Sequence, residues 1–181
     1  MRAVHIALLR AVNVGGHGPV GMAELRRVAS QLGLSEVRTF LQSGNLLFRG
    51  APRSSAALER QLEAGVLQEL GLETQFVVRD TNAWAEARER NPFPQEARED
   101  PAHLLVVFLK TPAAPGGEKA LRAAVRGPER LRVIGSQAYL VYPAGIAHSR
   151  LTLPLVEKHL GSQGTGRNWN TVTRLAALAA E

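Results

Sequence analysis

The stretch of this sequence that most resembles a chemical motif is a glycine-rich segment near the N-terminus. Gly16, Gly18 and Gly21 have the G-x-G-x-x-G spacing that binds dinucleotides when it joins a strand directly to a helix. Here the apolar stretch ends several residues before Gly16, and Pro19 has no amide to donate. The acidic residue at the right distance, Glu36, precedes the next apolar stretch instead of ending it. The segment therefore predicts a loop that turns toward a helix, and not a dinucleotide site.

A second group of polar residues follows the first predicted strand and fills a later turn. In a sheet where the first two strands are parallel, this loop and this turn lie at the same edge. The candidate ligand-binding residues there are Arg10, Asn13, Gly15, Gly16, Gln42, Ser43 and Asn45. They combine hydrogen-bond donors with one permanent cation and no carboxylate, which suits an anion or a polar ligand held by backbone amides. Ser, Gly and Asn also build turns for local reasons, so a purely structural role stays open.

The segment "TGRNWNTV" near the C-terminus supplies a second candidate wall, made of Arg167, Asn168 and Asn170. Asn168 or Asn170 can cap the final predicted helix, and Trp169 can begin its apolar side. An arginine at a helix N-terminus opposes the helix dipole, so we expect Arg167 to pair with a ligand anion or with a buried carboxylate. This wall joins the first one only if the final helix folds back onto the first half of the chain.

Several chemistries lack the residues that they need. The sequence has two aspartates, Asp80 and Asp100, and neither is expected at the candidate edge, which disfavours magnesium-dependent phosphoryl transfer. The five histidines share no metal-ligand spacing, and there is no cysteine. His17 and Ser43 have no visible acidic partner, which disfavours a hydrolase. We predict no catalytic residue, no metal ligand and no cofactor, and leave open whether the protein is an enzyme.

The elements that position these residues follow from hydrophobic periodicity. In the first half, strands are expected at residues 3–9, 36–42, 45–50 and 73–79, with helices at 22–32 and 58–70. The order β-α-β-β-α-β is the ferredoxin-like, or split βαβ, arrangement.

The second half repeats most of this order. A short helix ending at residue 90 and a charged connection lead to a buried strand at 103–109. A helix at 118–126, a hairpin of 130–135 and 137–143, and a helix at 150–160 follow. The chain then ends with a flexible loop at 161–166 and a helix at 168–180. We therefore predict an α+β protein with a ferredoxin-like lobe, residues 1–80, and a second, related α/β lobe with a C-terminal helix, residues 81–181. The lobes can form one compact unit and can share one sheet or have two.

Charge and composition restrict the partners. The formal net charge is +6 and the pI is about 10.7, which can favour nucleic acid. The arginines are scattered and form no long run, so this alternative rests on diffuse charge alone. The segment at the N-terminus is too short and strand-like for a signal peptide, and no stretch is long enough to span a membrane. We expect a soluble, cytoplasmic protein.

Several stretches together resemble the bacterial family known as domain of unknown function 1697. They are "ALLRAVNVGG", "MAEL", "VRTFLQSGN", "NPF", "VVFL", "EKHLG" and "TGRNWNTV", in order from residue 7 to residue 175. Two departures, at 18–19 and 165–166, remove a lysine and a threonine that an anion site would use. The resemblance implies a ferredoxin-like α/β fold and no activity, because the family has no established function.

The favoured hypothesis is a soluble protein that binds a small polar or anionic ligand at a rim of the first-strand loop, the "QSGN" turn and the "RNWN" segment. One alternative is a nucleic-acid-associated basic protein. Another is a homo-oligomeric or partner-binding scaffold. The sequence leaves the identity of the ligand and the oligomeric state open.

Overall fold

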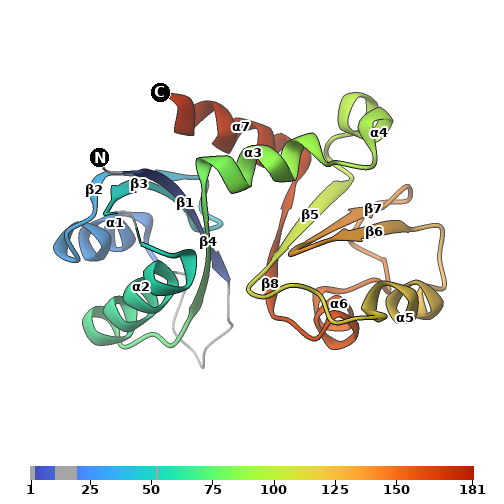
Figure 1. The fold of residues 1–181 in the computed structure, drawn as a ribbon, viewed down its shortest axis with the longest axis horizontal. Helices are drawn as coiled ribbons and strands as arrows, with labels where there is room; N and C mark the ends of the chain where they lie inside the picture. The colour runs from blue at the N-terminus through green and yellow to red at the C-terminus, as the bar shows by residue number, and fades with distance from the viewer. Residues whose placement is uncertain (1–2, 11–19, 52) are drawn as a thin grey trace. The chain divides into compact units, whose positions relative to one another are not determined.

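The computed structural model describes residues 3–10, 20–51 and 53–181. These residues form a mixed α+β structure with two four-stranded antiparallel sheets and seven helices (Figure 1). The chain divides into two compact units, Met1–Ala85 with Leu175–Glu181, and Glu86–Arg174. Of the two arrangements left open above, one shared sheet or two, the second is found. The predicted lobes meet at residues 80 and 81, a few residues before the chain enters the second unit.

The first unit contains the predicted elements with small shifts of their ends. They are β1 (Ala3–Arg10), α1 (Met22–Gln31), β2 (Ser35–Phe40), β3 (Asn45–Gly50), α2 (Ser55–Leu70) and β4 (Gln75–Asp80). The strands lie in the order β2-β3-β1-β4, so β1 and β3 are the inner strands. Helices α1 and α2 cover one face of this sheet (Figure 1).

The hydrophobic pattern explains why the helices of this unit pack as they do. Leu25 and Val28 of α1, and Leu58 and Leu62 of α2, recur at helical spacing and are fully buried, or nearly so, against the sheet. Helix α2 ends at Gly71, whose φ of +66° is the left-handed conformation that glycine adopts without strain.

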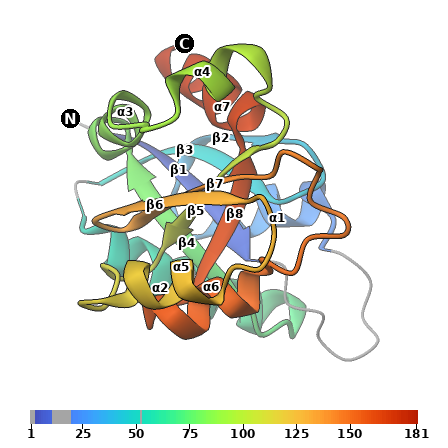
Figure 2. The same ribbon diagram turned by 90° about the vertical axis from the view of Figure 1, so that its right-hand side faces the viewer.

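The second unit repeats the strand order of the first. Its elements include α4 (Pro94–Glu99), β5 (Leu104–Leu109), α5 (Gly117–Ala124), β6 (Arg130–Ile134), β7 (Gln137–Val141), α6 (Leu153–Leu160) and β8 (Gly164–Asn168). Its sheet has the order β6-β7-β5-β8, and α5 and α6 cover one face (Figure 2). Two further helices, α3 (Thr81–Glu89) and α7 (Trp169–Ala180), each have residues in both units.

Two predictions for this half are wrong. The segment 161–166, expected to be a flexible loop, leads into strand β8 and supplies its first residues. The two glycines of the strand, Gly164 and Gly166, have low strand propensity and so obscure it in the sequence, but a side chain at either place would be crowded. A Cβ on Gly164 would lie 2.7 Å from the backbone oxygen of Phe108, and one on Gly166 would lie 2.9 Å from Leu105. The connection after residue 93 is also not all loop, because Pro94 begins the short helix α4.

Helix glutamates accept hydrogen bonds from an edge strand in each sheet. In the first unit, Glu59 and Glu63 lie four residues apart on α2 and accept hydrogen bonds from the amides of Val78 and Phe76 on the edge strand β4, each at 2.9 Å. In the second unit, Glu157 of α6 accepts from an amide of β8 at 2.9 Å. Amides of an edge strand otherwise remain open to pairing with another chain, so these carboxylates both satisfy and block the edge.

The end of α7 belongs to the first unit. The guanidinium of Arg38, on β2, donates to the backbone oxygen of Leu178 at 2.6 Å and to the carboxylate of Glu181 at 2.8 Å. An arginine near the last carbonyls of a helix complements the helix dipole. The final residues of the helix therefore contact the sheet formed by the first half of the chain.

His5 is a buried polar residue in the centre of the first unit. Its ring stacks on Phe48 with 5.5 Å between ring centroids, and neither ring nitrogen has a hydrogen-bond partner among the described residues. Burial lowers the pKa of His5 from its ordinary value of 6.5, and the nearby Asp80 opposes this shift. The histidine is therefore neutral in the folded protein at pH 7.

We predict that Glu59→Ala lowers the free energy of unfolding by about 2 kcal/mol, because it leaves the buried Val78 amide without its acceptor. Chemical denaturation measures the change. The control is Glu69→Ala on the same helix, where the exposed ion pair with Arg27 is worth less than about 1 kcal/mol. Equal losses in the two variants would contradict a special role for Glu59 at the strand edge.

We also predict that His5→Phe removes part of the acid sensitivity of the fold. Below pH 6.5 the unfolded chain takes up a proton at His5 that the folded chain resists, so the free energy of unfolding of the wild type falls with pH. The phenyl ring of the variant cannot take up that proton. Unfolding curves of the two proteins should therefore diverge as the pH decreases below 6.5, and parallel pH profiles would refute the assignment.

Candidate functional site

The sheet of the first unit brings part of the predicted rim together. Leu8 pairs with Asn45, and the amide of Leu9 donates to the oxygen of Gly44 at 2.7 Å. The end of β1, at Arg10, therefore lies beside the turn that joins β2 to β3. Arg10 is partly exposed, and Gln42 and Ser43 are exposed. The other predicted members of this wall, Asn13, Gly15 and Gly16, lie outside the described residues.

Asn45 has a structural role in this turn. Its side chain is fully buried, and its Nδ2 donates to the oxygen of Phe40 at 2.7 Å and to Oγ of Ser43 at 3.0 Å. These two bonds join both ends of the turn. Asn45 therefore has the purely structural role in the turn that the sequence left open.

The backbone of the same turn is strained at Leu41. Its φ is +59°, which is uncommon for any residue other than glycine, and its side chain is 52% exposed. Gly44, with φ of +76°, is a glycine for a further reason. A Cβ at this residue would lie 2.5 Å from the Cβ of Leu9. Burial does not compensate the strain at Leu41, and such outliers cluster at functional sites.

The predicted second wall belongs to the second unit, and Arg167 precedes the first residue of α7 by two positions. It lies in strand β8 and is 7% exposed. Its Nη1 donates to the backbone oxygen of Gly166 and to Oγ1 of Thr165, both at 2.8 Å. Burial lowers the pKa of Arg167 to about 10, which still leaves it charged at neutral pH.

The two asparagines beside Arg167 differ in their surroundings. Oδ1 of Asn168 accepts from the amide of Thr171 at 3.0 Å, so Asn168 caps α7, one of the two expected caps. Asn170, in the first turn of the helix, is exposed.

The junction of strand and helix at Arg167 has a counterpart in the first unit. Arg79 is also buried in an edge strand, and its Nη1 also donates to the carbonyl of the preceding residue at 2.8 Å. The next residue, Asp80, caps α3 as Asn168 caps α7. The repeat shows that an arginine at this place satisfies a carbonyl at the edge of its own sheet.

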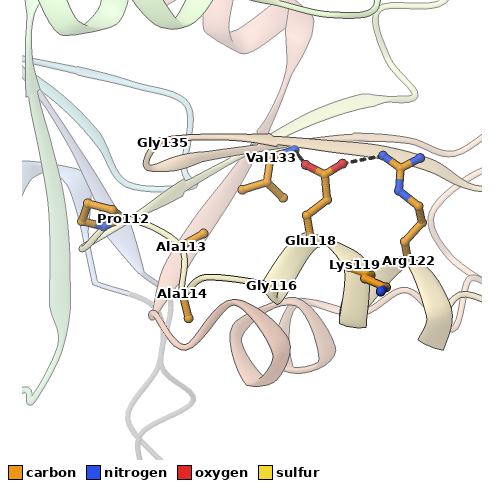
Figure 3. A pocket seen from close by; sticks show the side chains of 9 residues that line it. All are labelled: Pro112, Ala113, Ala114, Gly116, Glu118, Lys119, Arg122, Val133 and Gly135. Carbon is orange, nitrogen blue, oxygen red and sulfur yellow. Dashed lines mark hydrogen bonds and ion pairs between the residues drawn. The ribbon is translucent and has the colours of Figure 1, made fainter.

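The second unit contains a cavity that the sequence did not indicate. It has a volume of about 510 Å³ and lies between the start of α5, the preceding loop and the β6–β7 hairpin (Figure 3). Small and apolar residues form most of its wall, and three residues carry charge. The lining residues are Pro112, Ala113, Ala114, Gly116, Glu118, Lys119, Arg122, Val133 and Gly135.

Glu118 holds the charged part of this cavity in place. Its carboxylate accepts from the amide of Val133 at 2.9 Å and from Nη2 of Arg122 at 2.5 Å, as Figure 3 shows. Burial by itself would raise the pKa of Glu118, but these two bonds and the charge of Arg132 outweigh it and keep the pKa below 4.5. Glu118 is therefore ionised at neutral pH, and it closes the edge of β6 while it orients Arg122.

The cations of the cavity exceed its anions. Nη2 of Arg122 makes both hydrogen bonds of this side chain, to Glu118 and to the oxygen of Leu131 at 2.9 Å. Its Nε and Nη1 have no acceptor in the part of the chain that the structure describes. Lys119 is exposed and has no ion-pair partner within the same residues. The arrangement can therefore offer donors and one net positive charge to an anion.

A second cavity of about 360 Å³ also has Arg122 in its wall. It lies along β6 and the segment after α5. Its lining residues are Phe93, Arg122, Val125, Gly127, Glu129, Arg130, Leu131 and Arg132. Arg130 lies over the ring of Phe93, 5.5 Å from its centroid, and forms an ion pair with Glu96.

The sequence carried one signal for these cavities. Residues 117–132 contain five of the 22 basic residues and two glutamates, which gives this segment a net charge of +3. The charges are spaced through a helix and a strand and form no run. A helix whose Glu118 and Arg122 are four residues apart, beside a strand with two arginines, is visible as a cluster only once the packing of α5 on the hairpin is known.

Two other features are absent from the described residues, a cluster of metal-ligating side chains and a membrane-spanning helix. No group of three or more histidine, aspartate and glutamate side chains could hold a metal ion there. No helix in residues 3–10, 20–51 and 53–181 is long and apolar enough to cross a membrane.

Comparisons with known proteins identify the family and the fold. The model of a family described as Protein of unknown function (DUF1697) matches residues 2–139. The structure of the conserved bacterial protein SP0830 from Streptococcus pneumoniae is similar over 100% of both chains, with a TM-score of 0.76 and 21% sequence identity. At this identity the likeness shows the fold alone. A comparison with curated proteins gave no significant match.

We predict that Leu41→Gly raises the free energy of unfolding by up to about 1 kcal/mol, because glycine adopts a positive φ without the strain of a side chain. The control is Leu67→Gly, at a residue that is also 52% exposed but lies inside α2, where glycine costs about 1 kcal/mol. Thermal and chemical unfolding measure both. A loss at residue 41 as large as that at residue 67 would contradict strain in the turn.

Proposed function

The chain belongs to this family of unknown function, and we propose that it binds a small anionic ligand in the cavity beside α5. The observation that carries the proposal is the pairing of a hollow of about 510 Å³ with two cations that keep free donors, Lys119 and Arg122. Ligand sites are typically concave and mostly apolar, with a few convergent polar groups that orient the ligand.

The lining residues contribute to binding in different ways. Arg122, held by Glu118, offers Nε and Nη1, and Lys119 adds a flexible ammonium at the same side of the helix. A guanidinium can donate two hydrogen bonds in fixed directions to the oxygens of a phosphate or carboxylate group, whereas an ammonium acts as a point charge. Pro112, Ala113 and Ala114 leave room for the rest of a small ligand (Figure 3). No residue of the cavity is assigned a catalytic role.

The rim expected from the sequence remains a second proposed site for the same kind of ligand. Its support is the neighbourhood of Arg10, Gln42 and Ser43 at one end of the first sheet, together with the strained Leu41. The proposal also includes a ferredoxin-like description of each unit, supported by the strand orders β2-β3-β1-β4 and β6-β7-β5-β8. The proposal also keeps the cytoplasmic location that the sequence led us to expect.

Inorganic phosphate at low ionic strength tests the proposed function. Titration followed by NMR should shift the backbone amide signals of Ala113, Ala114 and residues 116–122 and 133–135. Lys119→Gln and Arg122→Gln should each weaken binding by about tenfold, since a hydrogen bond to a charged group is worth about 1.5–3 kcal/mol.

The matched control is Arg126→Gln. Arg126 is exposed, follows the same helix and lines neither cavity. It should change the affinity less than twofold. An equal effect of all three substitutions would indicate attraction by net charge alone, and shifts at residues 41–45 that Arg10→Gln abolishes would move the site to the first unit. No shift with phosphate would refute the proposal.

A further inference from the structure

We propose, resting on the proposed function, that the ligand is a chain of at least two linked phosphate groups, which extends across Arg122 from the first cavity into the second. The starting observation is that Arg122 lines both hollows, of about 510 and 360 Å³. A ligand held by this guanidinium therefore has space on both sides of it.

The two cavities differ in their charge. The first combines one carboxylate, Glu118, with Lys119 and Arg122 among small and apolar residues. The second has three guanidinium groups, of Arg122, Arg130 and Arg132, and one carboxylate in its wall, Glu129. The excess of positive charge is therefore larger in the second cavity, which is the smaller one.

The carboxylates near the second cavity already have partners. Glu129 accepts a hydrogen bond from Oγ of Ser149, and Glu96 accepts from Arg130. Arg132 lies 3.5 Å from Glu118, and its side chain is 56% exposed. This long contact and high exposure make Arg132 available to a ligand, because exposed ion pairs contribute little.

Arg122 is suited to join two anionic groups. Two hydrogen bonds from Nη2 fix its position, although its side chain is 53% exposed. The remaining donors, on Nε and Nη1, point to different sides of the planar group, so each can donate to a different anionic oxygen. Adjacent phosphates of one chain can then share Arg122, with Lys119 at one end and Arg132 at the other.

Linked phosphates fit this row of cations better than a single anion does. A lone phosphate can contact one cavity only, so it leaves the other cations without a ligand. Phosphate chains occur as inorganic polyphosphate and as the tail of a nucleotide. The shared chemistry is the phosphate chain, and the two sources differ in whether an apolar ring accompanies it.

Calorimetric titration with inorganic phosphate and inorganic tripolyphosphate tests the inference. The wild type should bind tripolyphosphate at least about tenfold more tightly than phosphate. Arg132→Gln, at a residue that lines the second cavity and not the first, should remove most of this difference and leave phosphate affinity within twofold. Lys119→Gln should weaken both ligands, and Arg126→Gln should change neither.

The outcomes separate the two proposals. Equal affinities for phosphate and tripolyphosphate, unchanged in Arg132→Gln, would overturn the extended site and leave the proposed function intact. A gain that Arg126→Gln reduces as much as Arg132→Gln does would also overturn it, because the gain would then reflect net charge. Binding of neither probe would refute the proposed function itself. Adenosine triphosphate provides the last arm, since tighter binding than tripolyphosphate supports a nucleotide and weaker binding supports inorganic polyphosphate.

Discussion

The hydrogen bond from an edge-strand amide to a glutamate of the helix that covers the sheet is the interaction on which this structure depends most. It occurs on β4 with Glu59 and Glu63, on β6 with Glu118, and on β8 with Glu157. Each bond ties a helix to a strand at a definite place, which hydrophobic contact alone does not do. In the second unit, the same bond sets the position of Glu118 and, through it, the direction of Arg122. The same hydrogen bond that closes the edge of β6 thus also positions the charged residues of the candidate site.

The two units solve the problem of an open edge in the same way. Each places a buried arginine, Arg79 or Arg167, one residue before the cap of the following helix, and each arginine donates to the carbonyl behind it. Around the two arginines the sequences otherwise share a glutamine four residues before and an asparagine three residues after, and differ at the remaining nearby positions. The repetition is therefore one of geometry: an antiparallel edge strand that runs directly into a helix exposes a carbonyl just where a long donor can turn back to it.

The sequence predicts elements well where burial is periodic and poorly where backbone packing decides. Helices α1 and α2 and the two hairpins follow from apolar spacing and from glycines in turns. Strand β8 does not, because Gly164 and Gly166 have low strand propensity and are selected by contacts with Phe108 and Leu105, which are distant in sequence. Likewise, the position of Arg10 beside the 41–44 turn follows from strand order, whereas the cavity beside α5 depends on how a helix and a hairpin pack. No periodicity encodes that packing.

The contact of Arg38 with Leu178 and Glu181 has a consequence for the order of events during synthesis. The two partners are separated by 140 residues and more along the chain, although both belong to the first unit. All four strands of that unit have left the ribosome long before its last helix turn is made. The nascent first sheet must therefore survive, with the side of β2 at Arg38 uncovered, for the whole time that the second unit is translated. This uncovered side of β2 is where a chaperone, or a transient non-native contact, would bind the nascent chain.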